Sequence, residues 1–226
     1  LSYQEAAELA YFGAKVLHPK TIQPAIDKKI PVRVCNSRKP KAASTLIVSQ
    51  SEATPQTIKA IVHKSRITTV QVTSARMLGA YGFLRALFEI FDRHRTAVDV
   101  VTTSEVSVSL SIDDAANLPE LVSDLEELGS VEVEKDRTII SVIGEGLRNT
   151  PGIAARVFAV ISEINVSMIS VGASSVNLTF MVDEAHAEEA IKRLHRVCFE
   201  EQRVGEETVV SVRSTNVSSP SGRGLG

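Results

Sequence analysis

The stretch MLGAYGFLRALFEIFDRHRTAVDVVTTSEVSVSL, residues 77–110, decides the fold that we expect for this chain of 226 residues. In its second half, Val106, Val108 and Leu110 alternate with serines, which is the two-residue period of a half-buried strand. In its first half, apolar residues recur at three- and four-residue spacing and form one stripe along a helix: Phe83, Leu84, Leu87, Phe88 and Phe91. The stretch therefore predicts a glycine-containing loop, a helix over 82–94 and strands over 98–102 and 106–112.

The same order of elements occurs twice along the chain. Gly82 and Gly152 stand at the first strand-to-helix turn of each copy, 70 residues apart (152 − 82), which indicates a tandem duplication. Each copy has the order β-α-β-β-α-β, so the expected fold class is α+β with two ferredoxin-like domains. The other predicted elements are strands over 67–72, 131–133, 138–143, 166–171 and 176–182 and helices over 118–128, 152–164 and 185–197.

The second copy lacks a final strand of its own. Two segments are candidates for it: residues 57–63, centred on Ile58–Val62, and Thr208–Val212. Residues 50–66 otherwise have the composition of a linker. The last ten or so residues are rich in Ser, Gly and Pro, and residues 204–226 are expected to form a largely disordered tail.

The first 49 residues predict short elements that do not make a core of their own. Ser2 with Glu5 forms a capping box for a helix, and Pro19 opens a second helix that ends at about Asp27. Short strands are expected over 30–34 and 45–48. This region is typical of the end of an α/β domain.

The composition narrows the class of protein. A formal net charge of −2 gives no reason to expect nucleic acid or a membrane as a partner, and no apolar run approaches the roughly 20 residues of a membrane span. Cys35 and Cys198 lie far apart in sequence, make no disulfide framework and fit a reducing, cytoplasmic location. We expect both cysteines to be buried, and we expect no metal site.

Two features of the 77–110 stretch favour a free amino acid as ligand. A helix that begins at a glycine loop offers unpaired backbone N–H groups to an anion such as a carboxylate. Asp99 lies among valines, and a carboxylate in such a place needs a partner, for which an ammonium group is suitable.

Three motifs, in the same order, resemble the aspartate kinase family, most of all its lysine-inhibited form. Phe12–Pro19 is similar to a segment near the end of the amino-acid-kinase domain. Ser74–Leu78 with Gly82–Leu84, Val98–Asp99 and Thr102–Ser107 is similar to the first ACT domain, an amino-acid-sensing module. Gly172–Leu178 is similar to the matching turn of the second ACT domain.

The resemblance implies a domain plan and an activity. It implies the end of a kinase domain at 1–49, ACT domains at 67–135 and 136–203, and transfer of the ATP γ-phosphoryl group to the side-chain carboxylate of aspartate, the first step toward lysine, threonine and methionine. It implies that the full-length enzyme uses ATP with Mg²⁺ and that neither is tightly bound to this chain. The residues that match the family's nucleotide contacts are Phe12, Gly13 and Lys15. The family's Lys-Phe-Gly-Gly type motif and aspartate-binding residues do not occur in this sequence. No complete catalytic set is therefore expected, and the fragment alone should be inactive.

The resemblance also implies feedback inhibition by lysine, bound where two first ACT domains meet in a homodimer, with a tetramer as a further assembly. The residues that match the family's lining are Met77, Gly82, Phe83, Leu84, Val98, Asp99, Thr103, Ser104 and Glu105. Three alternatives stay open from the sequence. They are threonine as the effector, a stand-alone amino-acid-binding module, and a structural dimerisation unit in which Asp99 and Glu105 form salt bridges.

Overall fold

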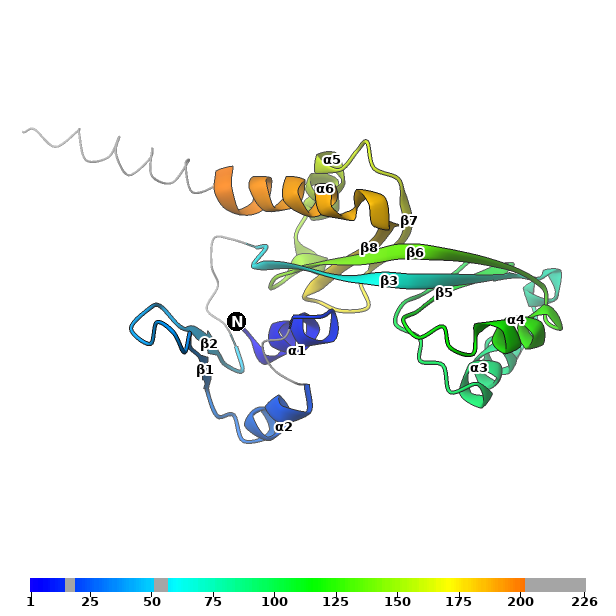
Figure 1. Cartoon of the computed structure of the whole chain (residues 1–226), viewed down its shortest axis with the longest axis horizontal. Helices are drawn as coiled ribbons and strands as arrows, with labels where there is room; N and C mark the ends of the chain where they lie inside the picture. The colour runs from blue at the N-terminus through cyan, green and yellow to red at the C-terminus, as the bar shows by residue number, and fades with distance from the viewer. Residues whose placement is uncertain (15–18, 51–56, 202–226) are drawn as a thin grey trace, which may run out of the picture.

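The computed structural model describes residues 1–14, 19–50 and 57–201, and its largest feature is a six-stranded antiparallel sheet (Figure 1). The strand order is β4-β5-β3-β6-β8-β7. The strands of this sheet are β3 (Ala60–Thr73), β4 (Val101–Thr103), β5 (Ser107–Ile112), β6 (Ser130–Ile143), β7 (Val166–Val171) and β8 (Asn177–Asp183). The helices beside it are α3 (Phe83–Arg93), α4 (Leu118–Glu126), α5 (Ile153–Val160) and α6 (Glu184–His195), with short turns η1 (Ala75–Met77), η2 (Leu147–Asn149) and η3 (Arg196–Glu200).

Two 14-residue strands, β3 and β6, belong to both repeats at once. In the first repeat, the C-terminal half of β3 pairs with the N-terminal half of β6, and Val70 lies opposite Val133. In the second repeat, the N-terminal half of β3 pairs with the C-terminal half of β6, and Ile61 lies opposite Val142. The first repeat thus has the order β6-β3-β5-β4 and the second β3-β6-β8-β7, which is the ferredoxin-like arrangement twice over. The predicted α+β class with two such repeats is confirmed.

The continuity of these strands differs from the sequence-based expectation. Separate strands were expected over 131–133 and 138–143, and residues 50–66 were expected to be a linker in which 57–63 was one candidate for the final strand of the second repeat. Instead the pairing continues through two register shifts between Lys64 and Thr69, with Arg66 and Asp136 at positive φ (60° and 55°). Bulges of this kind let a strand bend without ending. Residues 60–63 therefore lie beside β6 in the second repeat, whereas Thr208–Val212 falls outside the described residues.

Each repeat places its two helices against its own half of the sheet. In Figure 1, α5 and α6 lie above the two long strands and α3 and α4 lie below them. The glycine at the start of the first helix is left-handed in both repeats, with φ of 85° at Gly82 and 76° at Gly152, which explains why glycine recurs there. Leu87, Phe91 and Leu121 are buried in the first core, and Val157, Phe180 and Leu194 in the second.

A third core lies on the other face of the sheet and is closed by helix α1 (Tyr3–Tyr11). Along β6, Ile140 and Val142 belong to the core of the second repeat, while the alternate residues Ile139 and Ile143 pack with Leu9 and Phe12. Edge strands β4 and β7 approach each other across this face. The sheet therefore curls with its helices outside, and α1 sits at the concave side.

The rest of the N-terminal part is small. The capping box that the sequence predicted is formed, because Glu5 N–H donates to Ser2 Oγ (3.1 Å) and Ser2 N–H to Glu5 Oε2 (2.7 Å). Helix α2 spans Pro19–Asp27 as expected, and β1 (Val32–Val34) pairs antiparallel with β2 (Thr45–Ile47). Cys198 is buried, but Cys35 is exposed, so the expectation that both would be buried was wrong for Cys35.

Candidate functional site

The loop between β3 and α3, together with the first turn of α3, contains four of the residues predicted to line the effector site: Met77, Gly82, Phe83 and Leu84. Ser74 caps the η1 turn by accepting from Arg76 N–H, and Met77 ends that turn. Gly82 then starts α3, whose N-terminus has no side-chain cap. Met77 and Phe83 are half-buried against the first core, whereas Leu84 is exposed. The first-turn N–H groups of α3 are thus available to an anion.

The turn between β4 and β5 lies next to this loop, since Ser74 N–H donates to the Val106 carbonyl (2.8 Å). Thr103, Ser104 and Glu105 are exposed there. Ser104 Oγ accepts from Ser107 N–H (3.1 Å), so its hydroxyl stabilises the turn as well as facing the solvent. The predicted residues from Met77 to Leu84 and from Thr103 to Glu105 are therefore brought together at one end of the first repeat.

Val98 and Asp99 lie at the other end of β4, and the Asp99 carboxylate already has an ammonium partner. Lys64 Nζ is 2.8 Å from Asp99 Oδ2, and the Tyr11 hydroxyl donates to Asp99 Oδ1 (2.8 Å). Lys64 Nζ is also 2.8 Å from Asp113 Oδ2 and 5.7 Å from the centre of the Tyr11 ring. We call Tyr11, Lys64, Asp99 and Asp113 the Asp99 cluster.

The charges of the Asp99 cluster reinforce one another. Burial opposes the charge on Lys64, but the hydrogen bonds with Asp113 and Asp99 outweigh it and raise the lysine pKa. The hydrogen bond from Lys64 holds the pKa of Asp113 below its usual value. Burial, then the hydrogen bond to Asp99, raises the pKa of Tyr11 well above its ordinary value. At neutral pH the cluster therefore contains a charged lysine and a tyrosine that keeps its proton.

The residues predicted to contact a nucleotide follow α1 directly. Phe12 is buried in the third core, and Gly13 has φ of 105°, with the His63 carbonyl oxygen 3.1 Å from where a Cβ would stand. Lys15 lies outside the described residues. The described part of this segment is thus packed against β3, one residue after the tyrosine of the Asp99 cluster.

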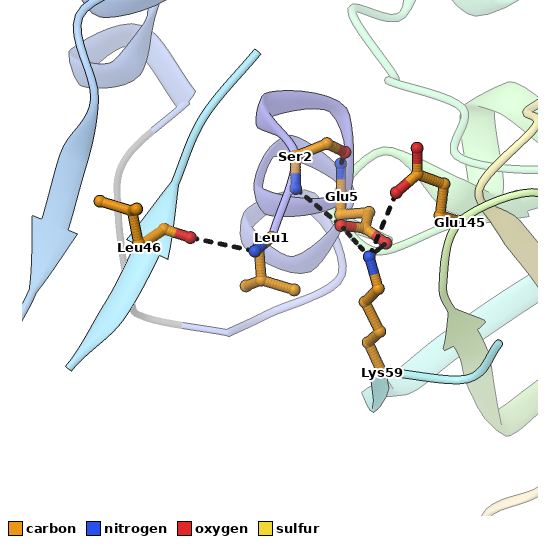
Figure 2. Close-up of polar contacts among 6 residues, drawn as sticks. All are labelled: Leu1, Ser2, Glu5, Leu46, Lys59 and Glu145. Atoms are coloured by element: carbon orange, nitrogen blue, oxygen red, sulfur yellow. Dashed lines mark hydrogen bonds and ion pairs between the residues drawn. The ribbon is translucent and has the colours of Figure 1, made fainter. Parts of the chain in front are cut away.

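Sequence reasoning missed a second charged cluster at the N-terminal end of α1 (Figure 2). Glu5 has no exposed side-chain surface, and Lys59 Nζ lies 3.0 Å from Glu5 Oε1 and 3.3 Å from Glu145 Oε2. The sequence predicted Glu5 only as a capping residue. We call Glu5, Lys59 and Glu145 the Glu5 cluster. It joins α1 to the start of β3 through Lys59 and to the loop after β6 through Glu145.

Comparison with known proteins agrees with this architecture. The ACT domain family model matches residues 140–197 of the second repeat. Aspartokinase 1, chloroplastic, of Arabidopsis thaliana is 44% identical over 211 residues, covering 88% of this chain and 37% of the relative. A putative C-terminal regulatory domain of aspartate kinase from Porphyromonas gingivalis W83 is 38% identical, with a TM-score of 0.58, over 64% of this chain and 99% of that chain. The chain belongs to the aspartokinase family.

Aspartokinase III of Escherichia coli is similar over 88% of this chain, at 40% identity. Its structure with aspartate and ADP has a TM-score of 0.80 to this chain, and its structure with lysine and aspartate one of 0.78; 46% of that chain is covered in each case. The present chain thus spans less than half the length of these aspartokinases.

Two negative findings concern only the residues that the structure describes. No helix there is long and apolar enough to span a bilayer. No group of three or more His, Cys, Asp or Glu side chains there is arranged to hold a metal ion.

Proposed function

We propose that this chain is the regulatory portion of a lysine-sensitive aspartokinase, a cytoplasmic enzyme that phosphorylates the side chain of aspartate with ATP. The observation that carries the proposal is the Asp99 carboxylate, which accepts a lysine ammonium group at 2.8 Å in a place where the side chain is only 6% exposed. A carboxylate of this kind would also bind the ammonium group that distinguishes the expected effector. The E. coli relative crystallised with lysine supports the same choice.

Each part of the lysine molecule has a proposed partner. The uncapped N-terminus of α3, at Gly82, Phe83 and Leu84, would hold the α-carboxylate. Asp99 and Glu105 would receive the two ammonium groups. Met77 and Val98, both half-buried, would line the methylene chain, and Thr103 and Ser104 would add hydroxyl contacts.

These partners stand at opposite ends of β4, and we propose that two copies of the first repeat complete the site between them. Large apolar side chains of the first repeat are exposed, and we propose that they contribute to one interface: Leu78, Tyr81, Leu84, Phe88, Val101 and Val106. An apolar surface of this kind is typical of an interface. A homodimer through this surface, which could pair further into a tetramer, would cover it.

Inhibition then follows as linkage between effector and catalysis. Lysine that binds one arrangement of the dimer better shifts the enzyme toward that arrangement, by no more than its difference in affinity. In the full enzyme, Phe12, Gly13 and Lys15 would contact ATP, whose Mg²⁺ neutralises charge during phosphoryl transfer. Helix α1 connects this segment to the sensor.

The test is isothermal titration of the purified chain with lysine, with threonine and methionine as controls, together with light scattering for the oligomeric state. We expect saturable lysine binding to a dimer and loss of that binding in Asp99→Asn, which keeps the size of the side chain. Saturable binding of threonine instead would change the effector and keep the sensor. A folded dimer that binds none of the three amino acids would contradict the proposal.

A structural dimerisation unit is the second candidate, and the salt bridge between Lys64 and Asp99 is the observation that favours it. In that case the wild-type chain would show no heat of amino-acid binding, and Asp99→Asn would only lower the free energy of unfolding. The titration separates the two candidates.

A further inference from the structure

Lys64 is shared between two carboxylates that differ in their access to solvent. Its Nζ lies 2.8 Å from an oxygen of each, but the Asp99 side chain is 6% exposed and that of Asp113 44% exposed. Lys64 itself comes from the part of β3 that pairs in the second repeat, next to the register shift after Lys64. One ammonium group on a bending strand thus joins a buried and a solvated acceptor.

We propose that Lys64 is an internal competitor for the effector: the effector ammonium displaces Lys64 from Asp99, and Asp113 keeps Lys64 after the exchange. This inference rests on the proposed function, because it concerns the same carboxylate. It adds a residue that sets the affinity of the site without lining it, and a second residue, Asp113, that acts in the opposite direction.

Charge balance makes the exchange feasible. Removing a cation from a buried carboxylate is costly when nothing replaces it, but replacing one ammonium by another leaves Asp99 paired throughout. Lys64 keeps the more exposed Asp113 as its partner, so its own charge is not stranded. The hydrogen bonds that raise the Lys64 pKa and lower the Asp113 pKa keep both groups ionised at neutral pH.

The exchange would also change the contacts of α1. Tyr11 is the last residue of α1, and its hydroxyl donates to the other oxygen of Asp99 (2.8 Å). Its ring faces Lys64, with the ammonium 5.7 Å from the ring centre. An effector at Asp99 therefore changes both partners of the residue that directly precedes Phe12 and Gly13. The position of Lys64 couples the occupancy of the sensor to the end of the kinase-domain segment.

The test is lysine titration of the full chain carrying single substitutions with opposite expected signs. Lys64→Gln, which keeps a hydrogen-bond donor, removes the competing charge and should tighten lysine binding about three- to tenfold, since a larger fraction of sites is ready to bind. Asp113→Asn leaves Lys64 with Asp99 as its carboxylate in the cluster and should weaken binding by a similar factor. Lys192→Gln, which removes an exposed lysine paired with Glu188 on α6, is the matched control and should change nothing.

The outcomes distinguish this inference from the proposed function. If the wild-type chain binds lysine and Asp99→Asn does not, but Lys64→Gln binds with unchanged or weaker affinity, the competitor role is overturned and the sensor assignment stands. If the folded wild-type chain binds none of the three amino acids, both fall. Circular dichroism checks each variant for folding. Should Lys64→Gln not fold, Asp113→Asn decides alone, with weaker binding in support and unchanged binding against.

Discussion

The two ends of helix α1 are held by clusters that each contain one lysine and two carboxylates but are built differently. At each end, one lysine lies between a buried and an exposed carboxylate. Lys59, the residue before β3, lies between Glu5 and Glu145. Lys64, within β3, lies between Asp99 and Asp113. In the Glu5 cluster the buried carboxylate belongs to α1 itself and also accepts from the Ser2 N–H. In the Asp99 cluster it belongs to the first repeat, and α1 reaches it through the Tyr11 hydroxyl.

The two clusters also differ in how easily a cation from the solvent can reach the buried carboxylate and replace its lysine. Glu5 is fully buried and Lys59 is 12% exposed, so a mobile cation has little access to that pair. Lys64 is twice as exposed at 24%, whereas the exposed second carboxylate is common to both clusters, at 45% for Glu145 and 44% for Asp113. We infer that the Glu5 cluster fixes α1 to the second repeat and that the Asp99 cluster is the exchangeable contact.

Lys59→Met should have the largest effect, because it leaves the buried Glu5 carboxylate without its ammonium partner. Breaking a buried ion pair on one side costs about 3 kcal/mol of unfolding free energy. Urea denaturation followed by circular dichroism measures the loss. A cost below about 1 kcal/mol, the range of exposed pairs, would show that the Glu5 cluster is no fixed anchor.

Lys64→Met should cost less, about 1 kcal/mol, because the cluster is closer to the solvent and Asp99 keeps the Tyr11 hydroxyl as donor. The same denaturation experiment compares the two methionine variants directly. The contrast between the ends of α1 breaks down if Lys64→Met destabilises the chain as much as Lys59→Met does.

Tyr11→Phe sharpens the comparison by removing only the contact of α1 with Asp99. Tyr11 is 48% exposed, so the lost hydrogen bond should cost about 0.5 kcal/mol. A double-mutant cycle with Asp99→Asn should return a coupling of similar size between these two side chains. Strictly additive effects would mean that the hydroxyl and the carboxylate do not interact in solution.

Most of the fold could be predicted from the sequence because it depends on local patterns. The helix over Phe83–Arg93 and the glycines at 82 and 152 depend on neighbours along one element and were correctly predicted. Within the predicted apolar stripe, Leu87 and Phe91 are buried, but Leu84 and Phe88 are exposed, so the stripe was wrong at those two positions. The continuity of β3 and β6 could not be predicted in this way. Their bulges place Arg66 and Asp136, rather than glycines, at positive φ, so no residue type marks the bend.

The candidate site was predictable as a set of residues but not as a set of partners. Asp99 was identified as a carboxylate that needs a cation, yet Lys64 lies 35 residues away and Tyr11 lies 88 residues away in sequence. Pairing between residues so far apart in sequence depends on how the sheet curls and where α1 packs. The local spacing of residues does not predict either of these. Glu5 illustrates the same limit, since its cap was predicted and its burial against Lys59 was not.

The smallest expected effect is a pH dependence confined to the Asp99 cluster. The pKa of Asp113 is lowered by the hydrogen bond from Lys64, so its stabilising contribution is complete above the unfolded value of about 3.9 and is lost as the pH falls through the lower folded value. The pKa of Lys64 is raised against the effect of burial, so its contribution is complete below about 10.4 and is lost as the pH rises through the raised folded value. Between these limits the cluster should be insensitive to pH. An NMR titration of the Asp113 carboxyl carbon should show its pKa rise toward the ordinary value in Lys64→Gln and stay in place in Lys59→Met. Equal titration curves in wild type and Lys64→Gln would remove Asp113 as the second partner of Lys64, and with it the place to which the displaced lysine retreats.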